Sequence, residues 1–356
     1  MGETLAETGA DELLWREIAE QPDVLSALSA RQGELEALGR RLLGERPPLV
    51  VLVARGTSDN AATYARYLIE ILCRVPVSLA APSVYTLYGS TPHLEAAVVL
   101  ACSQSGASPD LVEVVRRARA AGARTLSLVN RVDSPLAEAS EHIIDIGAGV
   151  ERSVAATKSF TAQLLALAGL VLGGADGEDA AAARAAFDRV AEAAAGALAQ
   201  RDVVAAWARR HADWRTMYVV GRGLVFPVAL EIALKMKEMA GIVAEGYSAA
   251  DVRHGPIALS GPELPFLVAG GSGPAGKDLA DLAHAARAGQ SPVTALTDTA
   301  AVAASADEAL TYPALPEILS AVPLAITGQM AAYFLALARG LHPGAPAAIR
   351  KVTRTL

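Results

Sequence analysis

Residues 96–109 read Ala-Ala-Val-Val-Leu-Ala-Cys-Ser-Gln-Ser-Gly-Ala-Ser-Pro, and this stretch decides the fold. Seven apolar residues are followed by a polar turn and by a proline suited to the first turn of a helix. An apolar run without polar alternation indicates a strand covered on both faces, as in a parallel sheet flanked by helices. Similar runs and helical patterns alternate on either side of it, with strands predicted at 48–54, 125–129 and 143–146 and helices at 60–72 and 109–121. The chain is therefore predicted to have an α/β fold.

The pattern occurs twice. Val53-Ala54-Arg55-Gly56 returns 167 residues later as Val220-Gly221-Arg222-Gly223, and the apolar run that ends at Cys102 returns at 265–271. Matches in the same order at nearly one offset indicate two copies of one α/β domain. The predicted parts are a helical arm at 1–45, a first domain at 46–175, a linker helix at 176–200, a second domain at 201–340 and a tail at 341–356.

Composition excludes several classes of protein. The 356 residues carry a net charge of −7, which argues against a general nucleic-acid surface. Two cysteines, Cys73 and Cys102, suit free thiols in a reducing cytoplasm. The acidic start is unlike a signal peptide, and Pro323 and Thr327 interrupt the apolar stretch 321–338, which predicts a buried helix rather than a membrane span. No spacing resembles a metal site, so neither metal nor cofactor is expected.

Polar loops follow two of the predicted strands. Ser103, Gln104, Ser105 and Ser108 exceed what helix capping needs, and their hydroxyls and the loop amides suit a phosphate at a helix N-terminus. Gly56, Thr57 and Ser58 follow the other strand, where glycine permits close approach of a ligand. The second copy has Ser-Gly-Pro-Ala-Gly at 272–276 and lacks the hydroxyl cluster. Phosphate binding is therefore predicted for the first copy.

The helix predicted at 227–240 carries a charged stripe on an otherwise apolar sequence. Glu231, Lys235 and Glu238 stand at i, i+4 and i+7 and share one face. Turned inward, two acids and an amine suit proton transfer; turned outward, they form an ordinary ion-paired surface, and the pattern leaves both open. His254 precedes Gly255-Pro256 in a rigid loop, although most isolated histidines have no chemical role.

Together these motifs resemble the SIS (sugar isomerase) superfamily, and more closely the isomerase half of glutamine–fructose-6-phosphate amidotransferase and its stand-alone relatives. The resemblance also rests on Val-Ala-Ala-Thr-Lys-Ser-Phe-Thr at 154–161. It implies two tandem SIS domains, each a parallel sheet flanked by helices in a flavodoxin-like or Rossmann-like three-layer sandwich. It also implies a homodimer that binds a hexose 6-phosphate, without nucleic acid or membrane.

The resemblance implies a role for each motif. The serine loop, which contains Ser103, Gln104, Ser105 and Ser108, holds the sugar phosphate beside Gly56, Thr57 and Ser58. The main chain near Val154 and Ala155 contacts the sugar. Glu238 moves a proton between C1 and C2, supported by Lys235 and Glu231. His254 opens the sugar ring and is lent by the neighbouring subunit. The tail lysine of the family, which forms or stabilises an imine, corresponds to Lys351 or, after a shift of one residue, to Arg350.

Several reactions fit this pattern. The chain is too short for a glutaminase domain, and residue 2 is Gly2 rather than a nucleophilic cysteine, so glutamine-dependent synthesis is not expected. The favoured activity is glucosamine-6-phosphate deaminase/isomerase, which gives fructose 6-phosphate and ammonia. The alternatives are a dehydratase acting on N-acetylglucosamine 6-phosphate, another ketose/aldose phosphate isomerase, a deglycase, or a non-catalytic sugar-phosphate sensor.

Overall fold

The computed structural model describes residues 2–346 and 351, with side chains from residue 9 onward. These residues form two compact units, each with one five-stranded parallel sheet. The first-sheet unit comprises residues 24–150 and 162–187. The second-sheet unit comprises residues 2–23, 151–161, 188–346 and 351. The segment 151–161 therefore belongs to the second-sheet unit, although it follows the strands of the first sheet.

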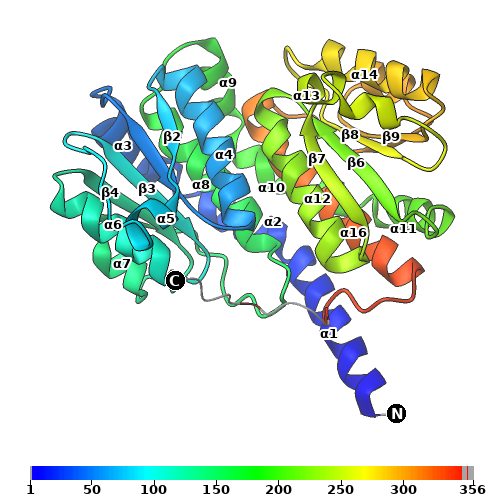
Figure 1. Cartoon of the computed structure of the whole chain (residues 1–356), viewed down its shortest axis with the longest axis horizontal. Coiled ribbons are helices and arrows are strands. Elements are labelled where there is room, and N and C mark those ends of the chain that lie inside the picture. Colours follow the sequence, from blue (N-terminus) through cyan, green and yellow to red (C-terminus); the bar gives the residue numbers. More distant parts are fainter. Residues whose placement is uncertain (1, 347–350, 352–356) are drawn as a thin grey trace. The chain divides into compact units, whose positions relative to one another are not determined.

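The first sheet has the strand order β2-β1-β3-β4-β5 (Figure 1). Right-handed crossovers that leave β1 and β3 in opposite directions place their helices on opposite faces. Helix α4 packs on β1, β2 and β3, whereas α5, α6 and α7 cover a core that includes Val53, Val115 and Leu136. The strands are β1 (Val50–Val53), β2 (Val77–Leu79), β3 (Val98–Ser103), β4 (Arg124–Val129) and β5 (His142–Asp145).

Helices complete the first-sheet unit. A close contact joins α3 to α8, because a Cβ on Gly39 would lie 1.8 Å from the carbonyl oxygen of Leu170, so only glycine fits there. The helices are α2 (Gln21–Ser29), which starts in the other unit, α3 (Gln32–Leu43), α4 (Thr57–Leu68) with a π-helical turn η1 (Ile69–Cys73), α5 (Pro82–Thr86), α6 (Pro109–Ala120), α7 (Pro135–Ala139), α8 (Lys158–Gly173) and α9 (Glu178–Ala185).

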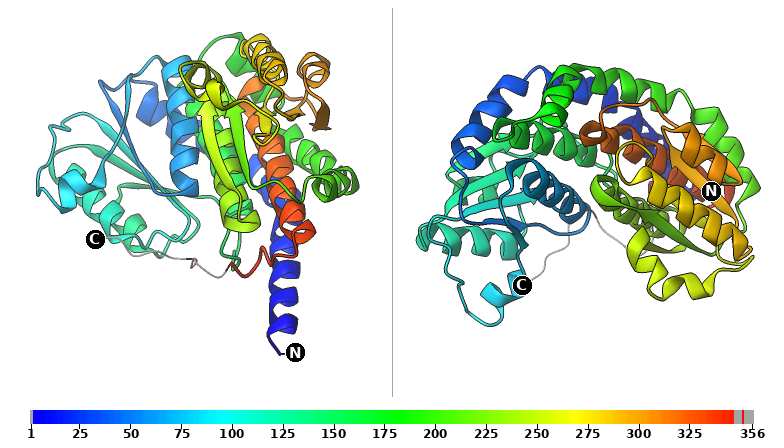
Figure 2. Two further views of the ribbon diagram at one scale, coloured as in Figure 1. Left: turned by 45° about the vertical axis from the view of Figure 1, so that its right-hand side comes forward. Right: turned by 90° about the horizontal axis from the view of Figure 1, so that it is seen from above.

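The second sheet has the order β10-β9-β8-β6-β7, which is the same order as the first when counted from its own strands. Alternate side chains of β6 point to opposite faces. Tyr218 and Val220 pack in a core with Leu279 and Leu282 of α14, while α12 packs on β6, β7 and α16 (Figures 1 and 2). The strands are β6 (Thr216–Gly221), β7 (Val243–Ser248), β8 (Phe266–Ala269), β9 (Val293–Thr297) and β10 (Glu308–Thr311).

The shared strand order confirms the predicted duplication and the predicted α/β class. The remaining helices of the second-sheet unit are α1 (Gly2–Ala19), α10 (Val190–Leu198), α11 (Arg201–Arg210), α12 (Phe226–Ala240), α13 (Ala249–Arg253), α14 (Gly276–Ala288), α15 (Ala300–Ser305) and α16 (Glu317–Ala338). Short 3-10 turns lie at η2 (Phe187–Arg189), η3 (Gly223–Val225) and η4 (Pro256–Leu259).

Helix α16 is the core helix of its unit. Its 22 residues are long and apolar enough to cross a membrane, yet its most apolar 18-residue window is 100% buried inside the protein. It contacts α10, α11 and α12, and inside it the Thr327 hydroxyl donates to the Pro323 carbonyl at 3.0 Å. The sequence-based interpretation of 321–338 as a buried helix is confirmed.

The alanine-rich stretch 176–200 differs from its prediction as one linker helix. It forms α9 and α10, separated by the turn η2. The break occurs where Ala186 leaves helical geometry and Phe187 becomes completely buried, with 0% of its surface exposed. Burial of one aromatic side chain outweighs continuation of the helix, since it removes a large apolar area from water.

Candidate active site

The first sheet brings two predicted ligand loops together. β1 and β3 are neighbours, with Val53 opposite Ala101, and the chain leaves them in opposite directions. Such a switch point is where open parallel sheets bind ligands. The Arg55 guanidinium of the β1 loop lies 3.0 Å from the carboxylate of Asp110, a buried residue in the first turn of α6. This ion pair ties the loop after β1 to the loop after β3.

The serine loop is shaped by its own hydroxyls. Ser103 Oγ accepts a hydrogen bond from Gly106 N at 3.1 Å, and Ser105 Oγ accepts one from Ala107 N at 3.3 Å. Gly106 has φ 61°, and a Cβ there would lie 2.1 Å from Ser134 Oγ. Because both serine oxygens act as acceptors, their O–H groups remain donors for an anion. Gln104 is half-buried in the same loop.

The helix start does not account for the serine cluster. Ser108 stands at the N-cap of α6 but makes no side-chain capping bond, and Pro109 follows it. The N-terminal amides of α6 and the helix dipole favour a bound anion at this position. On the neighbouring α4, Gly56 is the N-cap with φ 55° and Thr57 begins the helix. Ser58 is buried, and its Oγ accepts from Gln163 Nε2 at 3.0 Å.

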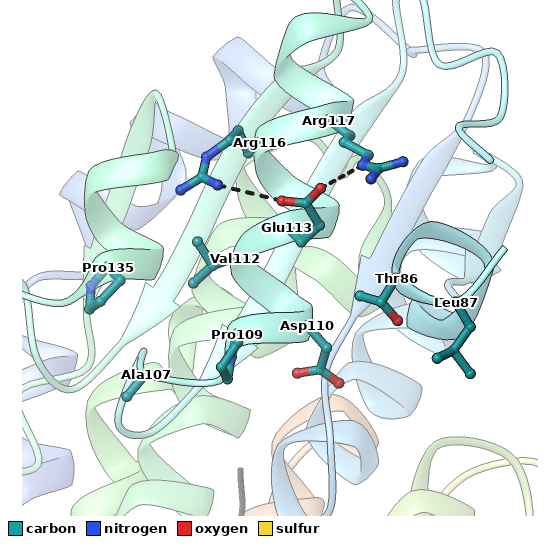
Figure 3. Close-up of a pocket in the computed structure, with 10 residues that line it drawn as sticks. All are labelled: Thr86, Leu87, Ala107, Pro109, Asp110, Val112, Glu113, Arg116, Arg117 and Pro135. Atoms are coloured by element: carbon teal, nitrogen blue, oxygen red, sulfur yellow. Dashed lines mark hydrogen bonds and ion pairs between the residues drawn. The ribbon is translucent and has the colours of Figure 1, made fainter. Parts of the chain in front are cut away.

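A cavity of about 570 Å³ adjoins the serine loop on the surface of α6 (Figure 3). Ala107, Pro109 and Asp110 line one end of it, but the predicted phosphate-binding serines do not. Farther along, Glu113 lies between two guanidiniums, 3.4 Å from Arg116 and 2.6 Å from Arg117. The cavity is therefore a neighbour of the serine loop and does not include its serines.

The corresponding loop of the second copy is occupied by the chain's own carboxylates. Ser272 N donates to Asp298 Oδ1 at 3.0 Å, and the Ser272 hydroxyl also bonds to Asp298. A Cβ on Gly273 would lie 2.1 Å from the carboxyl carbon of Glu317. Negative charge at this switch point repels a second anion. The arrangement supports the assignment of phosphate binding to the first copy alone.

Helix α12 carries its charged stripe inward. Lys235 and Glu231 are each 1% exposed, and their Nζ and Oε1 atoms lie 3.3 Å apart; Lys235 also pairs with Glu238. Although burial lowers the pKa of Lys235, the two carboxylates raise it more, so its pKa lies above the ordinary value. Glu238 is 23% exposed and is the only one of the three that reaches the surface. A buried ion pair therefore supports one accessible carboxylate, an arrangement suited to proton transfer.

His254 belongs to a different element of the same unit. It follows α13 and is exposed, and Gly255 after it has φ 158°. Its ring thus faces solvent, whereas Glu231 and Lys235 are buried against each other. An exposed histidine is available to another molecule; its predicted loan to a neighbouring subunit stays a prediction.

Glu151 is a site residue that the sequence did not reveal. Its buried carboxylate accepts from Lys351 Nζ at 2.8 Å, from Thr157 N at 2.9 Å and from the Ser159 hydroxyl at 2.7 Å. Burial raises the pKa of Glu151, but Lys351 and these donors lower it more, so the pKa lies below its usual value. The structure thus joins the loop 151–161, where Val154 is half-buried and Ala155 buried, to the predicted tail lysine. Arg350 lies outside the described residues.

The described side chains include no group of three or more His, Cys, Asp or Glu residues arranged to hold a metal ion. The candidate functional groups are the serine loop, the α12 stripe and the Glu151–Lys351 pair. The first belongs to the first-sheet unit, and the other two belong to the second-sheet unit.

Two parallel sheets of identical strand order, with a glycine- and serine-rich loop at the first switch point, define a duplicated flavodoxin-like α/β protein. Two stretches, 47–173 and 212–339, match the SIS domain family, and the chain belongs to that family. Both copies predicted from the sequence are thereby identified as SIS domains, and the recognition of the family is confirmed.

Curated relatives are glutamine–fructose-6-phosphate aminotransferases (isomerizing). The protein from Gloeobacter violaceus is 33% identical over 96% of this chain and 58% of its own length. A protein from Thermus thermophilus is 34% identical over 96% of this chain and 59% of its own length. The chain thus spans less than two thirds of the curated relatives it matches.

Solved structures agree with this family. The C-terminal domain of glucosamine-fructose-6-phosphate aminotransferase from Francisella tularensis superposes with a TM-score of 0.83 at 26% identity, covering 92% of this chain and 96% of that chain. A candidate phosphosugar isomerase from Silicibacter pomeroyi has a TM-score of 0.78 at 32% identity and covers 93% and 99%. A glucosamine-6-phosphate deaminase from Thermotoga maritima, at 20% identity and TM-score 0.73, covers 96% and 100% and shares the fold.

Proposed function

We propose that this chain is a sugar-phosphate isomerase that acts as a glucosamine-6-phosphate deaminase, giving fructose 6-phosphate and ammonia. The observation that carries the proposal is the α12 stripe, in which a buried Glu231–Lys235 pair supports the accessible carboxylate of Glu238. A protein that only senses a sugar phosphate has no need for that stripe. The similarity to aminotransferases over 96% of the chain supports an amino sugar as substrate.

In the proposed reaction, the serine loop and Thr57 hold the phosphate, and His254 helps to open the sugar ring. Glu238 removes the proton from C2 of the open-chain aldehyde and returns a proton to C1. The product is an imine at C2, which water converts into the ketone of fructose 6-phosphate with release of ammonia. Lys235 pairs with Glu238 and so fixes the position of the carboxylate that acts as the base.

Lys351 has a supporting part in this scheme. Its ammonium is paired at 2.8 Å with Glu151, whose pKa is lowered, so it serves as a fixed cation beside the sugar and stabilises the imine. The buried thiols take no part: burial raises the pKa of Cys73 to about 11, which leaves it protonated and unreactive at neutral pH. Two unpaired cysteines suit the cytoplasm.

A proton NMR time course of the purified protein with glucosamine 6-phosphate tests the reaction. We expect the substrate signals to decay while fructose 6-phosphate and ammonia accumulate. N-acetylglucosamine 6-phosphate is the matched comparison, because it has the same phosphate and ring but no free amine. A new vinylic proton from this second sugar alone would identify a dehydratase and overturn the proposal, as would silence with both sugars.

The proposal includes a homodimer in which His254 is lent across the interface. Mixing inactive Glu238→Gln and His254→Asn chains tests this directly. If the histidine acts in the neighbouring subunit, each mixed dimer has one intact site, and random mixing restores about a quarter of the wild-type activity. If it acts within its own chain, every site keeps a defect and the mixture stays inactive.

A further inference from the structure

Helix α1 ends against the loop that contains Val154 and Ala155. Glu17, on its last turn, is 2% exposed, and its two carboxylate oxygens accept from the successive amides of Arg152 at 2.5 Å and Ser153 at 3.1 Å. Just beyond the helix, Glu20 lies 2.5 Å from the ammonium of Lys158, which is 3% exposed. A buried carboxylate that accepts from two main-chain amides fixes the orientation of that peptide segment, because leaving either group unpaired is costly.

The same helix also holds the segment that follows α16. Asp11 Oδ1 accepts from Gly344 N at 2.8 Å, and Oδ2 lies 2.9 Å from His342 Nδ1. A Cβ on Gly344 would lie 2.1 Å from the carbonyl oxygen of Ala10, so the two backbones touch. Figure 1 shows this segment running beside α1. Asp11 itself is 7% exposed.

A third contact comes from Gln21, directly after α1. Its amide oxygen accepts from the Thr161 hydroxyl at 2.7 Å, and its amide nitrogen donates to Gln329 Oε1 at 2.9 Å. Gln329 Nε2 in turn donates to the Thr157 carbonyl at 3.2 Å. All four of these side chains are at least 99% buried. The loop 151–161 is therefore fixed to α1 near its beginning and to Gln21, the first residue of α2, at its end.

The loop held by α1 supplies one partner of a buried ion pair. Its Glu151 carboxylate lies 2.8 Å from Nζ of Lys351. A helix that served only as a cover would bury apolar side chains, as Leu14 and Ile18 do here. Asp11 and Glu17 are buried carboxyl groups instead, and both accept hydrogen bonds from backbone amides, Glu17 from Arg152 N and Asp11 from Gly344 N.

We propose that α1 is a positioning element of the active site, in which Glu17 sets the loop 151–161 that carries Glu151, the partner of Lys351, while Asp11 fixes residues 342–344. The inference rests on the proposed function for its kinetic consequence. Glu17 and Asp11 touch no substrate in this scheme; they act through the main chain next to Val154 and at Gly344. Supporting residues of this kind determine how accurately a site is held.

The test compares Glu17→Gln and Asp11→Asn with Glu12→Gln, a change at an exposed position of the same helix. Each of the first two keeps the size of the side chain but removes the charge that two donors share. With glucosamine 6-phosphate we expect KM to rise about tenfold or more for Glu17→Gln, because charge-assisted hydrogen bonds are the stronger ones. Binding of inorganic phosphate, measured by calorimetry, stays within about twofold, since the serine loop belongs to the first-sheet unit.

Hydrogen exchange separates this inference from the proposed function. Amides of 151–161 should exchange faster in Glu17→Gln than in Glu12→Gln at a temperature where both are folded. Unchanged exchange there, or wild-type KM in both Glu17→Gln and Asp11→Asn, would overturn the inference while leaving the proposed function intact. If the wild-type protein does not turn over the sugar, the proposed function fails and the exchange result alone decides. Should Glu17→Gln not fold, the KM of Asp11→Asn decides the kinetic part of the inference.

Discussion

Replacing Lys235 by methionine removes the cation that two carboxylates of α12 share. Methionine fits the volume, so the main effect is electrostatic. Lys235 and Glu231 are both 1% exposed and lie 3.3 Å apart, and at an effective dielectric constant of about 20 their attraction is about 5 kcal/mol. Some of this offsets the cost of burying the lysine. We therefore expect Lys235→Met to lower the free energy of unfolding by about 3–5 kcal/mol, the range for a buried pair that loses one partner.

Tryptophan fluorescence during urea unfolding measures the free energy of unfolding of the second-sheet unit, which contains α12. All three tryptophans, Trp15, Trp207 and Trp214, belong to the second-sheet unit, so their signal follows the unit that contains α12. Lys237→Met is the matched control, because Lys237 is exposed on the same helix. Surface changes of this kind alter stability by less than about 0.5 kcal/mol. Equal midpoints for the two variants would refute the reasoning.

The pH dependence gives a second check on the same variant. The pKa of Lys235 is raised above its ordinary 10.5, so its contribution to stability is fully present below that pH and is lost as the pH rises through the folded-state value. Above that value Lys235 is neutral and no longer pairs with the two carboxylates. The stability gap between Lys235→Met and Lys237→Met should therefore narrow as the pH rises above 10.5.

Three further predictions follow from the site. Glu238→Gln should keep binding of sugar phosphate but lose turnover by about 10²–10⁴-fold, measured by ammonia release; turnover near wild type would remove Glu238 as the base. Gly106→Ala should weaken phosphate binding measured by calorimetry, because the added Cβ would lie 2.1 Å from Ser134 Oγ. Gly147→Ala is the control, because Gly147 has a similar φ of 60° but open space around it. Equal phosphate affinities of the two variants would contradict the packing argument. The pKa of Glu151 lies below its ordinary 4.5, so its contribution to stability is present above pH 4.5 and is lost as the pH falls through the lower folded-state pKa. Glu151→Gln should therefore unfold at a lower urea concentration than the wild type at pH 7. The difference between the two urea midpoints should shrink in acid.

The sequence was most informative where strands are covered on both faces. β1 and β3 appear as uninterrupted apolar runs, and their repetition 167 residues later was enough to predict the duplicated fold. The edge strands β2 and β7 gave no such signal, unlike the edge strand β5: β2 is three residues long and mostly exposed, and β7 contains Glu245 and Gly246 between buried positions. An edge strand needs only one apolar side, so its pattern resembles that of a loop.

Site residues could be predicted where a local sequence pattern specifies them and not where a distant contact does. The stripe on α12 was visible because helical periodicity alone places Glu231, Lys235 and Glu238 on one face. Its inward direction was left open, because only packing of α12 against α16 decides it; there a Cβ on Gly328 would lie 2.3 Å from Ile232. Glu151 was missed because its partner Lys351 is 200 residues away, and no local pattern specifies such a contact.

The placement of α16 has a consequence for synthesis on the ribosome. The first-sheet unit consists of residues up to 187 and can close while the rest of the chain is still being made. The other unit cannot, since α12 and α1 both pack on a helix that emerges only after residue 317. Until then the face of α12 that packs on α16 remains uncovered, and the nascent protein can aggregate through this apolar surface. Its second half should therefore depend on chaperones far more than its first.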